Sequence, residues 1–188
     1  MIGESDIRGA KILIVDDQES NIQLLESVLA TANYTSVASV MDPHKVYELH
    51  RQNHYDLILL DLKMPGMDGF QVLEALKEIE MDGYLSVLVV TANPDYKLRA
   101  LQSGARDFVS KPFDVTEVLA RVHNLLEVRL LHQKARHYAK TQEFMALHDP
   151  LTGLANRRLL VDRVSHAIIQ AKRNKGIMAD VYLDFDGV

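Results

Sequence analysis

The sequence predicts an α/β fold in which five parallel strands form one doubly wound sheet with helices on both faces. Short apolar runs alternate with amphipathic segments from Lys11 to about Leu131, which is the pattern of successive βα units. Several of these runs are continuously apolar rather than alternating, as expected for strands that are buried on both faces. Right-handed crossovers between parallel strands then distribute the helices over both faces.

The expected elements follow one another in a regular order. The strands are expected at residues 12–15, 34–39, 57–60, 87–90 and 108–109. The helices are expected at residues 22–29, 43–51, 72–79 and 94–102 and from 114 onward. Gly104 ends the fourth helix. Neither proline nor glycine occurs between Asp114 and Pro150, so the fifth helix is expected to continue past the sheet as a connector.

Composition limits the possible functions. A chain of 188 residues with 47% hydrophobic content can bury one core and part of a second. The chain has no cysteine, which excludes thiolate chemistry and suits a reducing compartment. No signal peptide or apolar run of about 20 residues is present, so a cytoplasmic protein with no membrane partner is expected. A net charge of −5 argues against nucleic acid as a partner, and the basic residues from Arg157 to Lys175 are interpreted as a solvated helix face.

Polar residues follow four of the five predicted strands. They are Asp16 and Asp17, then Asp61, Thr91 and Lys111. In the flavodoxin-like strand order 2-1-3-4-5, the carboxyl ends of the first and third strands meet where the strand order reverses. Two carboxylates about 4 Å apart repel by roughly 4 kcal/mol at an effective dielectric near 20, so three of them need a counter-charge.

Mg²⁺ takes oxygen ligands and can supply that charge, and Lys111 adds a fixed ammonium. Asp61 can act as a nucleophile because a carboxylate can form an acyl phosphate, and Thr91 can donate its hydroxyl to a phosphoryl group. The sequence therefore predicts a site for Mg²⁺ and phosphoryl transfer. Taken singly, each acid could instead be a helix cap or a solvated turn residue.

Residues 11–130 resemble the receiver domain of bacterial response regulators. The matching segments are Val15-Asp16-Asp17, Leu59-Leu60-Asp61, residues 64–69, Val90-Thr91-Ala92 and residues 108–113. The resemblance implies that a histidine kinase or phosphotransfer protein phosphorylates Asp61, that small phosphodonors also do so, and that Asp16 and Asp17 bind Mg²⁺. It further implies that the backbone carbonyl of Lys63 binds the metal and that the Lys111–Pro112 bond is cis.

The resemblance also implies a switch formed by Thr91 and Phe108. Phosphate on Asp61 would draw Thr91 inward, and Phe108 would rotate from an exposed to a buried position. This residue is often Tyr in the family, so Phe108 keeps the packing change without a hydroxyl. The fourth helix, the fifth strand and the fifth helix would carry the signal.

Residues 148–158 resemble the opening of GGDEF domains, the diguanylate cyclase family, and residues 181–187 resemble the first core strand of that family. The resemblance implies that Asp184 is a Mg²⁺ ligand of a second, incomplete site. The signature GG(D/E)EF turn does not occur in this sequence, so no cyclase activity is expected from this chain. The same opening resembles GGDEF domains that precede an EAL phosphodiesterase.

These observations predict a receiver domain at residues 1–128, a helical linker at 129–148 and the N-terminal part of a GGDEF domain at 149–188, continued in a longer protein. The leading hypothesis is a response regulator that controls a cyclic di-GMP output by forming a homodimer. A heptad counted from Val115 places Arg129, His132 and Arg136 at the seam, so the pattern leaves a coiled coil open.

A stand-alone interaction module remains an alternative. A DNA-binding regulator is disfavoured because residues 150–188 contain no helix-turn-helix pair. His50 and His54 could face one way as metal ligands, but they lack a third ligand, and surface histidines are the commoner interpretation.

Overall fold

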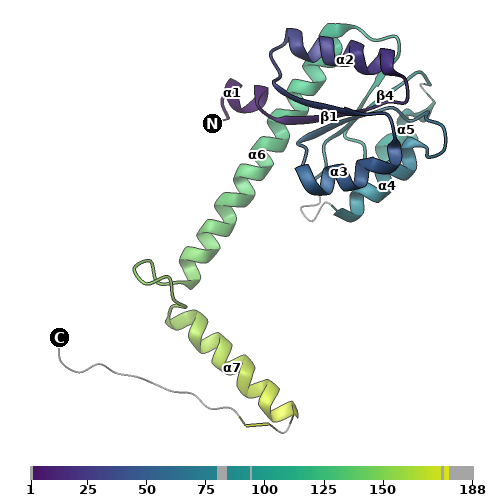
Figure 1. Ribbon diagram of the computed structural model, residues 1–188. Coiled ribbons are helices and arrows are strands. Elements are labelled where there is room, and N and C mark those ends of the chain that lie inside the picture. Colours follow the sequence, from purple (N-terminus) through teal and green to yellow (C-terminus); the bar gives the residue numbers. More distant parts are fainter. Residues whose placement is uncertain (1, 80–83, 94, 175, 178–188) are drawn as a thin grey trace. The chain divides into compact units, whose positions relative to one another are not determined.

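The computed structural model describes residues 2–79, 84–93, 95–174 and 176–177 (Figure 1). The chain divides into two units, residues 1–134 and 135–188, which are described separately. Within the described residues, no helix is both long enough and apolar enough to cross a membrane.

The first unit contains a five-stranded parallel sheet with the order β2-β1-β3-β4-β5, as predicted. The strands are β1 (Lys11–Val15), β2 (Ser36–Val40), β3 (Leu57–Leu60), β4 (Val87–Thr91) and β5 (Asp107–Ser110). Val15 pairs with Leu60 in the register of β1 and β3. Asp16 and Asp61 therefore leave neighbouring strands at the same level of the sheet.

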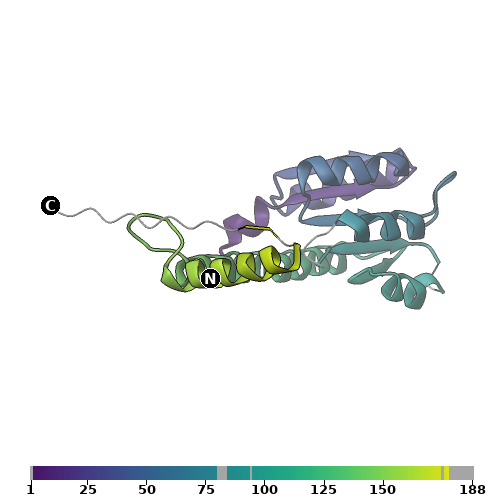
Figure 2. The ribbon, with the colours of Figure 1, turned by 90° about the horizontal axis from the view of Figure 1, so that it is seen from below.

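Helices cover both faces of this sheet (Figures 1 and 2). One face packs against α2 (Glu19–Thr31) and the first half of α6 (Val115–Leu147). The other face packs against α3 (Val46–Asn53), α4 (Gly69–Ile79) and α5 (Tyr96–Gln102). Alternate residues of β1 and β3 enter the two core clusters, because successive side chains of a strand point to opposite faces. This explains why both strands are continuously apolar.

The N-terminal helix α1 (Glu4–Arg8) was not predicted. The side chain of Asp6 accepts a hydrogen bond from the amide of Gly3 at 2.9 Å, and Ile7 is buried in the core. The guanidinium of Arg8 lies 4.9 Å from the centre of the Tyr34 ring. An isolated helix of this length is unstable in water, so tertiary contacts rather than helix propensity account for α1.

Three other expectations needed correction. The second strand begins at Ser36 rather than at residue 34, because the Tyr34 amide donates to the carbonyl of Leu29 in α2 and the Thr35 amide to that of Arg8, rather than to a neighbouring strand. The expected helix at residues 43–51 is divided into a 3₁₀ turn, η1 (Pro43–Lys45), and α3. His50 on α3 is buried against the ring of Tyr55, so the expectation of a surface histidine is wrong for this residue.

Contacts at the amino ends of the strands hold α6 beyond its last core residue, Leu126. Arg129 is buried and donates a hydrogen bond to the carbonyl of Tyr84. The ring of His132 stacks on that of Tyr84 at 4.9 Å. Gln133 Nε2 donates to Asp56 Oδ1 at 3.0 Å. The helix is therefore fixed to the receiver as far as Gln133.

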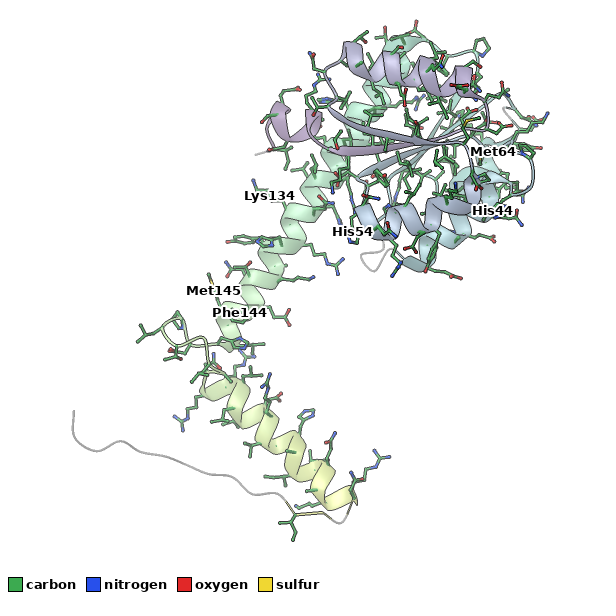
Figure 3. The ribbon with its side chains drawn as sticks, in the orientation of Figure 1. His44, His54, Met64, Lys134, Phe144 and Met145 are labelled. Atoms are coloured by element: carbon green, nitrogen blue, oxygen red, sulfur yellow. The ribbon has the colours of Figure 1, made fainter. Side chains whose placement is uncertain are left out.

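The second unit consists of the end of α6, a compact loop and α7 (Arg157–Asn174). Phe144 and Met145 near the end of α6 are exposed (Figure 3). In the loop, Asp149 Oδ1 accepts hydrogen bonds from the amides of Leu151 and Thr152 and from the Thr152 hydroxyl. No residue of α7 is buried. The predicted strand at residues 181–186, with Asp184, lies outside the described residues.

Candidate functional site

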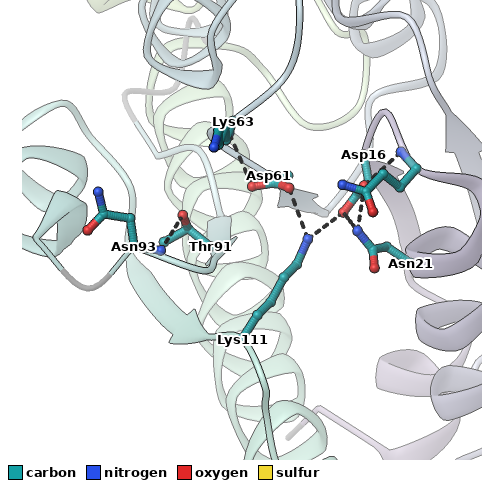
Figure 4. A network of polar contacts seen from close by, with 8 residues as sticks. Asp16, Asn21, Asp61, Lys63, Thr91, Asn93 and Lys111 are labelled. Carbon is teal, nitrogen blue, oxygen red and sulfur yellow. Dashed lines mark hydrogen bonds and ion pairs between the residues drawn. The ribbon is translucent and has the colours of Figure 1, made fainter.

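Three carboxylates, those of Asp16, Asp17 and Asp61, meet at the carboxyl ends of β1 and β3. Figure 4 shows Asp16 and Asp61 with Lys111 bonded to both. One carboxylate oxygen from each of Asp16, Asp17 and Asp61 lies within 4.8 Å of the others. Asp16 and Asp61 are only 1% and 6% exposed, whereas Asp17 is half-buried. This is the convergence that strand order and parallel register predict.

Lys111 lies between two of these acids. Its ammonium donates to Asp16 Oδ2 at 2.7 Å and to Asp61 Oδ2 at 2.9 Å. Burial by itself would lower the pKa of Lys111, but the hydrogen bonds to Asp16 and Asp61 outweigh burial, so the pKa is raised above its ordinary value. Lys111 therefore remains a cation at physiological pH.

The hydrogen bonds of the three acids differ. Asp16 Oδ1 accepts from the backbone amide of Gln18 at 2.9 Å, and Asn21 Nδ2 lies 2.9 and 3.0 Å from the two oxygens of Asp16. Asp61 Oδ1 accepts from the amide of Lys63 at 3.2 Å. In contrast, Asp17 Oδ1 is buried without a hydrogen-bond partner among the described residues. A buried polar atom without a partner is costly, so Asp17 is poised for a ligand.

The chemistry of this set fits Mg²⁺. Three carboxylates face one ammonium, which leaves an excess of negative charge, and oxygen atoms are the ligands that Mg²⁺ prefers. The orphaned oxygen of Asp17 supplies a free ligand position. Among the described residues, Asp16, Asp17 and Asp61 are the one group of three or more His, Cys, Asp or Glu side chains close enough together to hold a metal ion. His50 and His54 therefore do not belong to a metal site of this kind.

A cavity of about 480 Å³ opens above Asp61. Its lining includes Asn21, Lys63, Thr91 and Lys111. Thr91, the last residue of β4, is almost completely buried, and its hydroxyl oxygen accepts a hydrogen bond from the Asn93 amide at 3.3 Å. The Lys111–Pro112 bond beside the cavity is cis, as predicted. The cavity thus gives a ligand access to Asp61.

Phe108 lies on β5 and is not among the residues that line the cavity. Its ring is half-buried, with Lys97 Nζ 4.1 Å from the ring centre and the guanidinium of Arg121 5.8 Å from it. Arg121 is itself paired with Asp107 at 2.5 Å and with Glu117 at 2.8 Å. Cation–π contacts therefore link Phe108 to both α5 and α6.

The sequence prediction identified the acids, Thr91 and Lys111 but missed Asn21 and the Gln18 amide. Gln18 is the N-cap residue of α2 and Asn21 lies in its first turn, and both donate hydrogen bonds to Asp16. The available signal was the position of Asn21, five residues after Asp16 and immediately before the helix predicted at residues 22–29. An exposed helix position would have been an equally good explanation of that spacing.

The comparisons with known proteins agree with this geometry. Residues 12–123 match the response regulator receiver domain family. The response regulator PleD from Caulobacter vibrioides is 37% identical over 159 residues, which cover 81% of this chain and 35% of PleD. The DNA-binding transcriptional regulator RpaA from Synechocystis is 39% identical over 130 residues, which cover 68% of this chain and 54% of RpaA. The chain therefore spans only part of these relatives.

A solved structure shows the same fold. The receiver domain of a sensor histidine kinase from Pseudomonas aeruginosa, which has a magnesium ion coordinated in its active site cleft, aligns with a TM-score of 0.58 and 27% identity. The alignment covers 63% of this chain and 98% of that domain. Sequence match, strand order and site geometry lead to one conclusion: this chain belongs to the response regulator receiver domain family of two-component systems.

Proposed function

We propose that Asp61 is the phosphoacceptor of this receiver and that its phosphorylation controls a cyclic di-GMP output domain. The observation that carries the proposal is the arrangement of Asp16, Asp17 and Asp61 around the ammonium of Lys111, beside an open cavity. A buried carboxylate next to two other carboxylates, a cation and a cavity is suited to phosphoryl transfer rather than to helix capping.

In the proposed reaction, an oxygen of Asp61 attacks the phosphorus of a phosphohistidine on a histidine kinase or phosphotransfer protein. The new O–P bond forms as the P–N bond breaks, and the imidazole leaves with its electron pair. Mg²⁺ bound by Asp16, Asp17, Asp61 and the carbonyl of Lys63 would neutralise charge on the transferring group. Lys111 then exchanges its bond to Asp61 for one to a phosphoryl oxygen, and the hydroxyl of Thr91 donates to another.

The proposed readout is the packing of Phe108. Movement of Thr91 toward the phosphoryl group would vacate space at the end of β4 for the half-buried ring. The ring would then leave Lys97 on α5 and Arg121 on α6, the two cations that now flank it. Because α6 continues from the receiver into the second unit, a change at its first turns can reach the residues beyond it.

The similarity to PleD supports the output assignment. That alignment spans 159 residues, more than the receiver match at residues 12–123. We therefore assign residues 1–128 to the receiver, 129–148 to a helical linker and 149–188 to the start of a GGDEF domain, with Asp184 in its incomplete metal site. Dimerisation would bring two such domains together, which joining two GTP molecules requires. Without the GG(D/E)EF turn, this chain itself would make no cyclic di-GMP from GTP.

Labelling with acetyl phosphate tests the acceptor. The wild-type chain should gain one phosphoryl group in the presence of Mg²⁺ and none with EDTA, as measured by intact-protein mass. Asp61→Asn should abolish labelling. Asp68→Asn is a matched control, because Asp68 lies in the exposed loop after β3 and caps α4 through the Gln71 amide; it should label normally. Labelling of the Asp61 variant would show that another residue accepts the phosphoryl group.

Beryllofluoride, a mimic of the phosphoryl group, tests the switch. With Mg²⁺ it should change the NMR signals of the Phe108 ring and raise the molecular mass measured by light scattering to that of a dimer. If neither quantity changes while beryllofluoride is bound, the proposed switch and dimer are wrong, although Asp61 could still be the acceptor.

A further inference from the structure

The side chain of Asn21 is placed where it can control the first acid of the metal site. Its Nδ2 atom lies 2.9 Å from Asp16 Oδ1 and 3.0 Å from Asp16 Oδ2, so one amide group holds both oxygens. Asn21 is also part of the cavity lining, on the same side as Gln18. Its contact is therefore with the reacting site and not only with its own helix.

Asp16 has three kinds of donor, and they are not equivalent. The Gln18 amide is part of the backbone and stays in place, whereas the ammonium of Lys111 is shared between Asp16 and Asp61. If Lys111 gave up its bond to Asp16 as well as that to Asp61 on turning toward a phosphoryl group, the donors left to Asp16 among the described residues would be the Gln18 amide and the side chain of Asn21. Asp16 is 1% exposed, so water cannot readily replace a lost donor.

We propose that Asn21 is a positioning residue that holds the Asp16 carboxylate in its metal-binding orientation, with or without Lys111. The inference rests on the proposed function, because it assumes that Asp16 serves a Mg²⁺ site. A neutral amide can orient the carboxylate without placing a positive charge beside the cation, and a carboxylate that is already oriented loses less conformational freedom when the cation binds. Outer partners of this kind commonly change metal affinity by about 10- to 100-fold when they are removed.

Two variants distinguish the effect of the Asn21 hydrogen-bond donor from the effect of the volume of its side chain. Asn21→Leu keeps the approximate size of the side chain and removes the donor, whereas Asn21→Ala removes both. Gln23→Leu is the matched control, because Gln23 lies on the same helix, is exposed and bonds only to Glu19 within the described residues. The test uses the full chain.

The first readout is metal binding alone, with no phosphodonor. Free Mn²⁺ is counted by electron paramagnetic resonance, and Mg²⁺ is measured by competition. Both Asn21 variants should weaken binding by about tenfold or more, whereas Gln23→Leu should bind like the wild type. Equal binding by wild type and Asn21→Leu would overturn the inference. A loss seen only in Asn21→Ala, or equally in Gln23→Leu, would assign the effect to packing or helix stability and would also overturn it.

The second readout is the Mg²⁺ dependence of labelling by acetyl phosphate. The Mg²⁺ concentration for half-maximal rate should rise by the same factor as the dissociation constant, and the rate at saturating Mg²⁺ should remain near that of the wild type. A fall in the saturating rate with an unchanged half-maximal concentration would contradict a positioning role. If wild-type Asp61 does not label at any Mg²⁺ concentration, the proposed function fails, and the Mn²⁺ measurement still decides the role of Asn21.

Discussion

Replacing the proposed phosphoacceptor should stabilise the fold in the absence of metal. Three carboxylates lie within 4.8 Å of one another, and one ammonium contacts two of them. Asp61→Asn removes one negative charge from this buried group. Lys111 and the Lys63 amide bond to different oxygens of Asp61, so the single amide oxygen of the new side chain keeps the bond from Lys111 and the bond from the Lys63 amide is lost. Lys63 is exposed, so water can replace that lost bond.

The magnitude follows from the distances. At a separation of 4.8 Å and an effective dielectric near 20, each carboxylate pair repels by about 3–4 kcal/mol. The variant loses two such repulsions and one attraction of about 6 kcal/mol at the 2.9 Å separation of Lys111 and Asp61. The burial cost of one carboxylate also falls. We expect a net gain of about 1–2 kcal/mol in the free energy of unfolding, since most of these opposing contributions cancel.

Urea denaturation monitored by circular dichroism measures this difference. In EDTA, the Asp61 variant should unfold at higher urea than the wild type. At Mg²⁺ concentrations about 100 times the dissociation constant, binding stabilises the wild type by about 2.7 kcal/mol, so the order of stability should reverse. Asp68→Asn, with the same chemical change at an exposed site, should show neither effect. An Asp61 variant less stable than the wild type in EDTA would refute the electrostatic argument.

Two further predictions concern regions away from the site. Arg129→Met should lower the free energy of unfolding by about 1–2 kcal/mol, because it removes the charge-assisted hydrogen bond from the buried Arg129 to the Tyr84 carbonyl; an unchanged urea midpoint would contradict a role for Arg129 in holding α6. In the second unit, the backbone hydrogen bond from Thr152, its hydroxyl and the Leu151 amide lower the pKa of Asp149. A lowered folded pKa means that the loop is stabilised above the unfolded value near 3.9 and loses this stabilisation as pH falls through the folded value. The Thr152 amide NMR signal should therefore titrate with a midpoint below about 3.9 and become insensitive to pH in Asp149→Asn; a midpoint at or above about 4 would contradict this.

The fold and the main acids were predictable because they depend on local patterns and one topological rule. Continuous apolar runs marked β1, β3 and β4, and each led into a polar residue that belongs to the site: Asp16 after β1, Asp61 after β3 and Thr91 at the end of β4. The edge strand β2 was placed less accurately, since its residues are only partly buried and carry a weaker pattern. The helix α1 was missed because its five residues have no helical periodicity to detect.

The partners within the site depended on tertiary structure. A lysine after the last strand could have paired with Asp61 alone, but Lys111 contacts Asp16 as well, across 95 positions of sequence. His50 gave no sign of burial, and Arg129 gave no sign of its bond to the Tyr84 carbonyl.

The sequence by itself therefore determined which chemical groups lie at the carboxyl ends of the strands. Continuous apolar runs identify the buried strands, and their alternation with amphipathic segments predicts a parallel sheet whose carboxyl ends share one edge. Only the tertiary structure decided how those groups share their hydrogen bonds: Asp16 is held by Asn21, Gln18 and Lys111, whereas Asp17 keeps one oxygen that has no partner in the part of the chain that the structure describes. The physical reason is that hydrogen bonding depends on ångström-scale distances between segments far apart in the chain, which no local pattern specifies.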